Sequence, residues 1–248
     1  MTKTLLIYDR PAILSRDRHR HVHLDTSLND MRYASTSNSF LLAATELPDA
    51  ALHYPTVFIG PEGGPYTLAV LVGLRDGQNL FVGSEGHWEQ GAYIPAFVRR
   101  YPFVLSQDDN SPGGEFDVCI DENHRGFSGL DGSPPAPNGQ PLFLTDGTNA
   151  PLLDAAINYL KQFNAEMKRT RDFAAELDGF GLLEKRHIEV RREGNTSAVE
   201  GFRVVSEPRI AELKANQIKR LAEKGYLALA YAHILSMRQV QRLAAREA

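Results

Sequence analysis

The segment from His87 to Leu105 has the densest mixture of residue types able to bind a ligand. It holds the only tryptophan of the chain together with tyrosines, phenylalanines and an arginine pair. Arginine binds carboxylates and phosphates through two parallel hydrogen bonds, and large aromatic side chains add apolar surface with a polar tip. We therefore predict a site for a small organic ligand or a partner protein, with these candidate residues: Trp88, Tyr93, Arg99, Arg100 and Tyr101. The competing interpretation is a buried aromatic core, in which one arginine pairs with an internal carboxylate.

Three histidines, His19, His21 and His23, alternate along the chain. If this segment is extended, all three imidazoles project from one face, and that arrangement can bind a transition metal. A metal site needs a further ligand, for which these histidines are available: His53, His87 and His124. The competing interpretation is a solvent-exposed strand with arginines on its other face.

A third cluster runs from Asp121 to His124, where two adjacent carboxylates precede a histidine. Carboxylates beside a histidine can perform acid–base or metal chemistry. Together with His19, this cluster supports an alternative prediction of a metal-dependent enzyme. The simpler interpretation is the solvated end of a strand.

Composition excludes several classes of protein. The chain has 248 residues and a formal net charge of −4, so no basic field indicates nucleic-acid binding. Cys119 is the single cysteine, which rules out an intrachain disulfide and fits a reducing compartment. No apolar run approaches the ~20 residues that span a bilayer, and the first apolar run is too short for a signal peptide. We predict a cytoplasmic protein and leave signal-free export open.

The elements that must position these residues change character along the chain. The first 145 residues predict short strands, including Leu5–Tyr8, a hairpin of Thr56–Ile59 with Tyr66–Leu74, and Glu115–Asp121. Pro95 favours a short helix that ends near Arg100, followed by an extended segment.

Residues beyond 145 predict mostly helix. Apolar side chains recur at three- and four-residue steps from Pro151 until Gly179 and Gly181 end the helix. A hairpin is predicted between His187 and Val205, and a last helix from Tyr226 to about Arg246, with His233 as a core histidine.

These patterns predict the α+β class. A strand-rich antiparallel meander packs with a mostly helical part that contains one β-hairpin. We predict one unit, residues 1–248, with a sub-division at 1–145 and 146–248. A β-barrel with a helical cap and two independent domains are the alternatives.

Several segments resemble the bacterial SapC-like family, and the resemblance covers nearly the whole chain. The matching stretches are Arg16–His19, His53–Phe58, Gly73–Val82, Gly91–Leu105, Val118–Asp121, Gly201–Val205 and Tyr231–Ser236. The family takes its name from surface-layer loci, which implies a surface-layer association. Its members tend to be encoded near TonB-dependent receptors and flavin-dependent halogenases, which implies an accessory role in nutrient uptake or processing. The resemblance includes His19 but neither His21 nor His23, which argues against a metal site built from all three histidines.

The residues and the resemblance together predict a non-catalytic binding or accessory protein. No nucleophile–base pair, metal signature or nucleotide fingerprint stands in the sequence. We predict no cofactor other than a transition metal at His19. The alternatives are the metal-dependent enzyme and a surface-layer component, and a homo-oligomer stays open.

Overall fold

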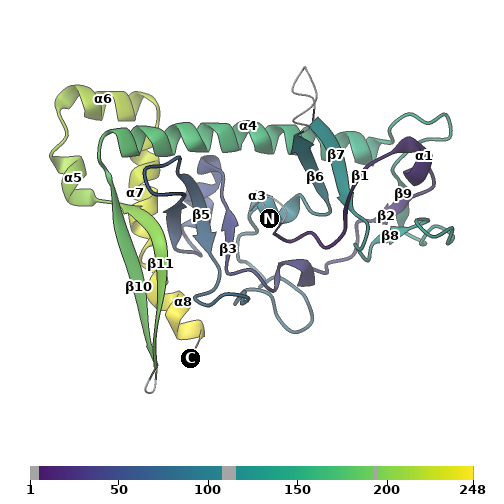
Figure 1. The fold of residues 1–248 in the computed structure, drawn as a ribbon, viewed down its shortest axis with the longest axis horizontal. Helices are drawn as coiled ribbons and strands as arrows, with labels where there is room; N and C mark the ends of the chain where they lie inside the picture. The colour runs from purple at the N-terminus through teal and green to yellow at the C-terminus, as the bar shows by residue number, and fades with distance from the viewer. Residues whose placement is uncertain (1–5, 108–115, 193–194, 248) are drawn as a thin grey trace. The chain divides into compact units, whose positions relative to one another are not determined.

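The structure, a computed structural model, describes residues 6–107, 116–192 and 195–247 (Figure 1). The strands are β1 (Pro11–Ile13), β2 (His23–Asp25), β3 (Ser39–Leu41), β4 (Thr56–Ile59), β5 (Thr67–Leu71), β6 (Phe103–Gln107), β7 (Phe116–Asp121), β8 (Phe127–Ser128), β9 (Gly139–Pro141), β10 (Leu183–Arg192) and β11 (Asn195–Val205). The helices are α1 (Arg16–His19), α2 (Leu47–Ala50), α3 (Ala96–Arg99), α4 (Pro151–Gly179), α5 (Glu207–Ala211), α6 (Ala215–Glu223), α7 (Tyr226–Ser236) and α8 (Gln239–Arg246), with 3₁₀ turns η2 (Arg32–Ala34) and η3 (Ala44–Glu46). The predicted α+β class is confirmed.

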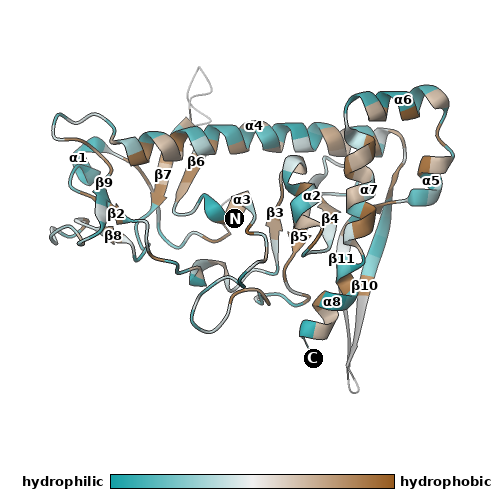
Figure 2. Cartoon of the chain, turned by 180° about the vertical axis from the view of Figure 1, so that it is seen from behind, coloured by the Kyte–Doolittle hydropathy of each residue, from teal (hydrophilic) through white to brown (hydrophobic). Residues whose placement is uncertain are grey.

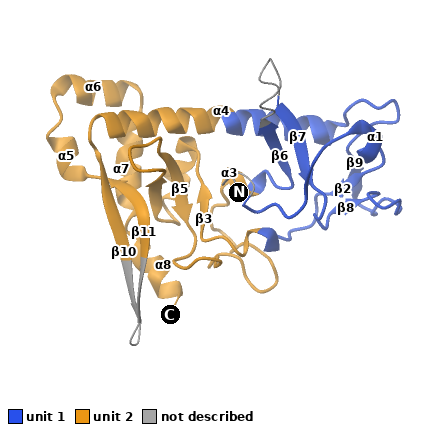
Figure 3. Cartoon of the chain, viewed as in Figure 1, with its two compact units in different colours: residues 1–33, 99–164 blue, residues 34–98, 165–248 orange. Residues whose placement is uncertain are grey.

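The chain divides into two compact units, each built from two segments (Figure 3). Unit 1 comprises residues 1–33 and 99–164, and unit 2 comprises residues 34–98 and 165–248. The segment from His87 to Leu105 therefore contributes to both units. The boundaries differ from the sub-division at residue 145, because the chain leaves unit 1 and returns to it.

Unit 1 contains two three-stranded antiparallel sheets, in the orders β1-β7-β6 and β8-β2-β9. Ile120 lies at the centre of the first sheet, since it pairs with Ala12 on one side and Phe103 on the other. The first half of α4 packs its apolar stripe into the core of this unit. The buried core residues are Val22, Leu24, Phe103, Ile120, Leu142, Phe143, Leu153 and Leu160.

Unit 2 contains a five-stranded antiparallel sheet in the order β10-β11-β4-β5-β3. β5 and α7 are coloured as hydrophobic in Figure 2, whereas much of the edge strand β10 is hydrophilic. Phe58 of β4 contacts Phe173 of α4 at 5.9 Å and His233 of α7 at 5.0 Å between ring centroids. The predicted long helix, the predicted hairpin of β10 with β11 and the core position of His233 are all confirmed. No helix in the described residues is long and apolar enough to cross a membrane.

His233 is fully buried, and its two ring nitrogens have different roles. Nε2 accepts a hydrogen bond from the Val205 N–H at 3.1 Å, so Nδ1 carries the hydrogen and donates to Thr56 Oγ1 at 3.0 Å. The hydroxyl groups of Thr56 and Ser236 also form a hydrogen bond, with 2.7 Å between their oxygens. Burial lowers the pKa of His233 to about 3. A neutral imidazole therefore joins β4, β11 and α7.

Two predictions about the chain termini are wrong. The predicted final helix is two helices, α7 and α8. They are separated after Ser236, where the N–H groups of Met237 and Arg238 bond to the carbonyls three residues earlier, Ile234 and Leu235, instead of four. The apolar spacing continues through this break, so periodicity does not reveal it. The first strand begins at Pro11 and not at Leu5; residues 6 and 7 form a turn, and Leu5 lies outside the described residues.

Glu46 fixes the backbone that leads into α3, and its replacement gives a testable prediction. One carboxylate oxygen accepts from the Ala43 N–H at 2.9 Å, and the other accepts from the Tyr93 hydroxyl at 2.8 Å and the Ala96 N–H at 2.7 Å. Glu46→Gln turns an amide N–H₂ group toward at least one of these donors. We expect the free energy of unfolding, measured in urea, to fall by about 1–3 kcal/mol.

The matched control is Glu223→Gln, which removes the same charge from an exposed site near Lys219. This variant is expected to stay within about 0.5 kcal/mol of the wild type. Equal stabilities for the two variants would contradict the assigned role of Glu46.

Candidate ligand-binding site

A cavity of about 430 Å³ lies within unit 1, a volume within the range of small-molecule sites. Its wall comes from the segment after β2, the end of α3, the start of β6, the turn after β7 and the first half of α4. The lining residues are Leu24, Asp25, Thr26, Leu28, Asp30, Met31, Tyr33, Arg99, Arg100, Tyr101, Pro102, Phe103, His124, Leu152, Ala155, Ala156 and Tyr159. Three of the five predicted binding residues, Arg99, Arg100 and Tyr101, therefore line one cavity.

Stacked tyrosines form one part of the wall. The rings of Tyr33 and Tyr101 lie 3.8 Å apart between centroids, with an interplanar angle of 19°. The Tyr101 hydroxyl donates to Asp121 Oδ2 at 3.0 Å, which fixes the ring. Burial, and then the charge of Asp121, raise the pKa of Tyr101 above its usual value. Tyr101 is therefore a protonated donor to Asp121 and offers its ring to the cavity.

Asp121 is fully buried and holds this wall together. Besides Tyr101, its carboxylate accepts from the N–H groups of Asp9 at 2.8 Å, Arg10 at 2.9 Å and Asn123 at 3.1 Å. The second carboxylate, Glu122, turns elsewhere and pairs with Arg10 at 3.0 Å. The adjacent acidic residues thus have separate structural roles, and neither lines the cavity.

The two arginines give the cavity its positive groups. Arg99 is exposed, and its guanidinium lies 5.8 Å from the ring centroid of Tyr159. Arg100 is buried between the rings of Tyr8 at 5.8 Å and Phe163 at 5.2 Å. Burial lowers the pKa of Arg100, and Tyr8 opposes that shift. Burial does not remove the charge of Arg100 at neutral pH, because an arginine guanidinium stays protonated in proteins.

The two lining carboxylates interact with groups of their own loops and neighbours. Asp25 accepts from the N–H of Ser27 at 2.8 Å and from its hydroxyl at 2.6 Å, and these bonds lower the pKa of Asp25. Asp30 lies 3.6 Å from Arg32 and 3.4 Å from Arg125. The charge of Asp30 is thus balanced by arginines, whereas the lowered pKa of Asp25 keeps that carboxylate negative at the cavity wall.

His124 has a defined tautomer at the cavity wall. Its Nδ1 accepts from the Gly126 N–H at 3.1 Å, so Nε2 carries the hydrogen. The ring meets Tyr101 at 5.2 Å and Phe127 at 5.6 Å, both edge to face. Burial lowers the pKa of His124, against the charges of Asp121 and Asp30. At pH 7 the neutral ring is therefore a hydrogen-bond donor and not a base at Nε2.

The structure does not bring the other two predicted residues into this cavity. Trp88 is buried in unit 2, where its Nε1–H donates to the Tyr54 hydroxyl at 3.0 Å and its ring neighbours Phe81. Tyr93, also in unit 2, donates to Glu46. For Trp88 the structure matches the core interpretation of the aromatic segment.

Sequence reasoning missed Tyr33 and the face of α4. Leu152, Ala156 and Tyr159 line the cavity from one side of that helix. These residues are four and three positions apart, a spacing visible in the sequence that places them on one face of a helix. Nothing in the sequence singles out Tyr33, which reaches the cavity only through the tertiary fold.

The predicted histidine strand is wrong, because His19 ends the one-turn helix α1 and only His23 begins a strand. His19 is fully buried. Its Nδ1 accepts from the Ser15 N–H at 2.9 Å, so Nε2 donates to Glu122 Oε1 at 3.1 Å. His53 and His87 belong to unit 2, whereas His19 belongs to unit 1. The described residues contain no group of three or more histidine, cysteine or acidic side chains able to hold a metal.

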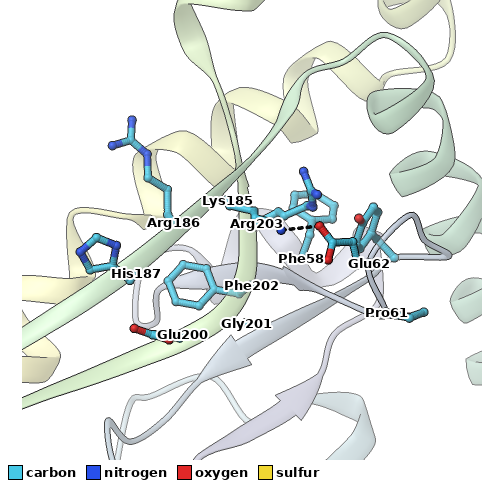
Figure 4. A pocket seen from close by; sticks show the side chains of 12 residues that line it. Phe58, Pro61, Glu62, Lys185, Arg186, His187, Glu200, Gly201, Phe202 and Arg203 are labelled. Atoms are coloured by element: carbon cyan, nitrogen blue, oxygen red, sulfur yellow. Dashed lines mark hydrogen bonds and ion pairs between the residues drawn. The ribbon is translucent and has the colours of Figure 1, made fainter.

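A second hollow, of about 410 Å³, lies in unit 2 between β10, β11 and the loop after β4 (Figure 4). Its cations already have protein partners: Lys185 pairs with Glu62, and Arg186 pairs with Glu184. Arg203 donates to the Leu183 carbonyl at 3.2 Å and lies over Tyr66. This hollow contains none of the five predicted binding residues.

Comparison with known proteins gives one family. The family model described as SapC matches residues 14–243, which is most of the chain. Neither the curated proteins nor the solved structures contain a match.

Proposed function

Because the chain belongs to the SapC family, we propose that it is an accessory protein that binds a small aromatic carboxylate in the cavity of unit 1. The proposal includes a cytoplasmic location and a link to TonB-dependent nutrient uptake, which the family resemblance suggests. One observation carries the choice of ligand: Arg99 and Arg100 line the same cavity as the stacked pair of Tyr33 and Tyr101.

The chemistry of the wall favours a ligand with two different ends. Guanidinium groups bind a carboxylate through paired, charge-assisted hydrogen bonds. Tyrosine rings and the apolar face of α4 favour a flat apolar body, since aromatic pairs gain about 0.5–1.5 kcal/mol beyond the area they bury. Leu152 and Ala156 supply that apolar face.

The lining groups described above support binding more directly than catalysis. Tyr101 is a protonated donor, and His124 is a neutral ring whose Nε2 carries a hydrogen. A general base needs an available lone pair within reach of the substrate proton. Neither ring offers that lone pair to the cavity, so the proposal assigns no catalytic step.

Replacement of Arg99 tests the proposal. Hydrogen bonds to charged groups contribute about 1.5–3 kcal/mol, so Arg99→Ala is expected to weaken benzoate binding about 10- to 100-fold. Arg99→Lys keeps the charge but loses the planar fork, and it should bind with intermediate affinity. Isothermal titration calorimetry with benzoate measures these affinities, and cyclohexanecarboxylate tests the requirement for a flat ring.

Arg16→Ala is the matched control, because Arg16 is an exposed arginine of unit 1 that does not line the cavity. It should bind benzoate like the wild type. The proposal fails if the wild type does not bind benzoate. It also fails if Arg99→Ala and Arg16→Ala bind it equally well.

A further inference from the structure

The side chain of His124 offers the cavity a neutral hydrogen-bond donor. Its Nδ1 is occupied by the Gly126 N–H at 3.1 Å. No hydrogen bond joins Nε2 to another of the described residues. The hydrogen on Nε2 is therefore available to a ligand, whereas the Tyr101 hydroxyl is already used by Asp121.

We infer that the ligand carries, besides its carboxylate, a neutral oxygen acceptor that binds His124 Nε2–H, which makes His124 a specificity-determining residue. This inference rests on the proposed function. A phenolic hydroxyl or a ring carbonyl has the required chemistry. If the ligand carried a second carboxylate, that group would be expected to face a second cation in the cavity.

The surroundings hold the ring in one orientation. Tyr101 and Phe127 pack against it edge to face, at 5.2 and 5.6 Å. Gly126 approaches so closely that a Cβ there would lie 2.7 Å from the ring atom Cε1. Rotation of the imidazole would give up the Gly126 hydrogen bond, so the donor keeps its direction.

The charged groups around His124 favour a neutral partner. Asp121 and Asp30 both act on the ring, while burial keeps its pKa below the ordinary histidine value. A neutral N–H donor discriminates between ligands because it forms a hydrogen bond with a ligand that carries an acceptor and forms none with a ligand that lacks it. A site that hydrogen-bonds a hydroxyl rejects the analogue that lacks it, and water in the open site reduces this discrimination to about tenfold, or 1.4 kcal/mol.

The test compares benzoate with its 2-, 3- and 4-hydroxy derivatives in calorimetric titrations. The wild type is expected to bind one isomer at least about tenfold more tightly than benzoate. In His124→Asn, the side-chain oxygen can still accept from the Gly126 N–H, but no donor reaches the Nε2 position. This variant should bind all four probes within threefold of one another.

His124→Gln is the rescue variant, because its longer amide can place an N–H near the former Nε2. It should regain part of the preference for the favoured isomer, which a purely structural role of His124 would not produce. The inference is overturned if the wild type shows no preference, or if His124→Asn retains it. Those outcomes leave the Arg99-dependent binding of benzoate intact, whereas loss of benzoate binding by the wild type contradicts the proposed function itself.

Discussion

Acidification from pH 7 to pH 4 is expected to lower the free energy of unfolding by about 3 kcal/mol through His233 alone. In the unfolded chain this histidine binds a proton near its ordinary pKa of about 6.5. In the folded protein burial lowers its pKa to about 3. Between these values the unfolded state binds more protons than the folded state. The stabilisation is therefore present above about pH 6.5 and is lost as the pH falls.

Urea denaturation at pH 7, 6, 5 and 4 measures this effect. The comparison is with His233→Gln, which has no group that titrates in this range and can still accept from the Val205 N–H. The variant is expected to lose about 1–3 kcal/mol at pH 7, because Thr56 loses its ring partner. Its stability should then decline less steeply than that of the wild type. Other titrating groups, His124 among them, contribute to both proteins and cancel in the difference. Parallel pH profiles would contradict a buried, neutral His233.

Asp121→Ala is expected to destabilise the protein by at least about 3 kcal/mol, because it removes a fully buried acceptor that serves four partly buried donors. The carboxylate accepts from three backbone N–H groups and the Tyr101 hydroxyl, and two of those N–H groups belong to Asp9 and Arg10, far away in sequence. The loss should appear as a lower midpoint in urea at pH 7.

Asp121→Asn is the matched variant, because it keeps the shape and one acceptor oxygen. Its stability should lie between those of the wild type and Asp121→Ala. Benzoate affinity should fall in Asp121→Asn, because the Tyr101 ring is held less firmly in the cavity wall. Stability of Asp121→Ala within about 1 kcal/mol of the wild type would contradict this central role of Asp121.

Local patterns predicted much of the secondary structure, because their causes are local. Pro95 precedes the one-turn helix α3, the apolar stripe begins α4 at Pro151, and the predicted hairpin forms β10 and β11. The break after Ser236 left no trace in the spacing of apolar residues. Nor could spacing reveal that α1 would curl to bury His19 beside Glu122.

The candidate site was predictable only in part, because contacts distant in sequence assemble it. The arginine pair and Tyr101 stand out in the sequence as a dense cluster of binding residue types. Tyr33 joins them only through a ring stack, and Asp121 is fixed by N–H groups more than 100 residues away. The same segment also supplies Trp88 to the core of unit 2. Composition alone does not separate these two uses of aromatic residues.

The most direct test of the account is to map benzoate binding on the protein by backbone and side-chain NMR. We predict chemical-shift changes at Leu24 to Tyr33, Arg99 to Phe103, His124 and the first half of α4, which line the cavity of unit 1. Changes confined to Lys185, Arg186 and Arg203, in the hollow of unit 2, would contradict the assignment of the site. An unchanged spectrum at saturating benzoate would contradict the proposed function.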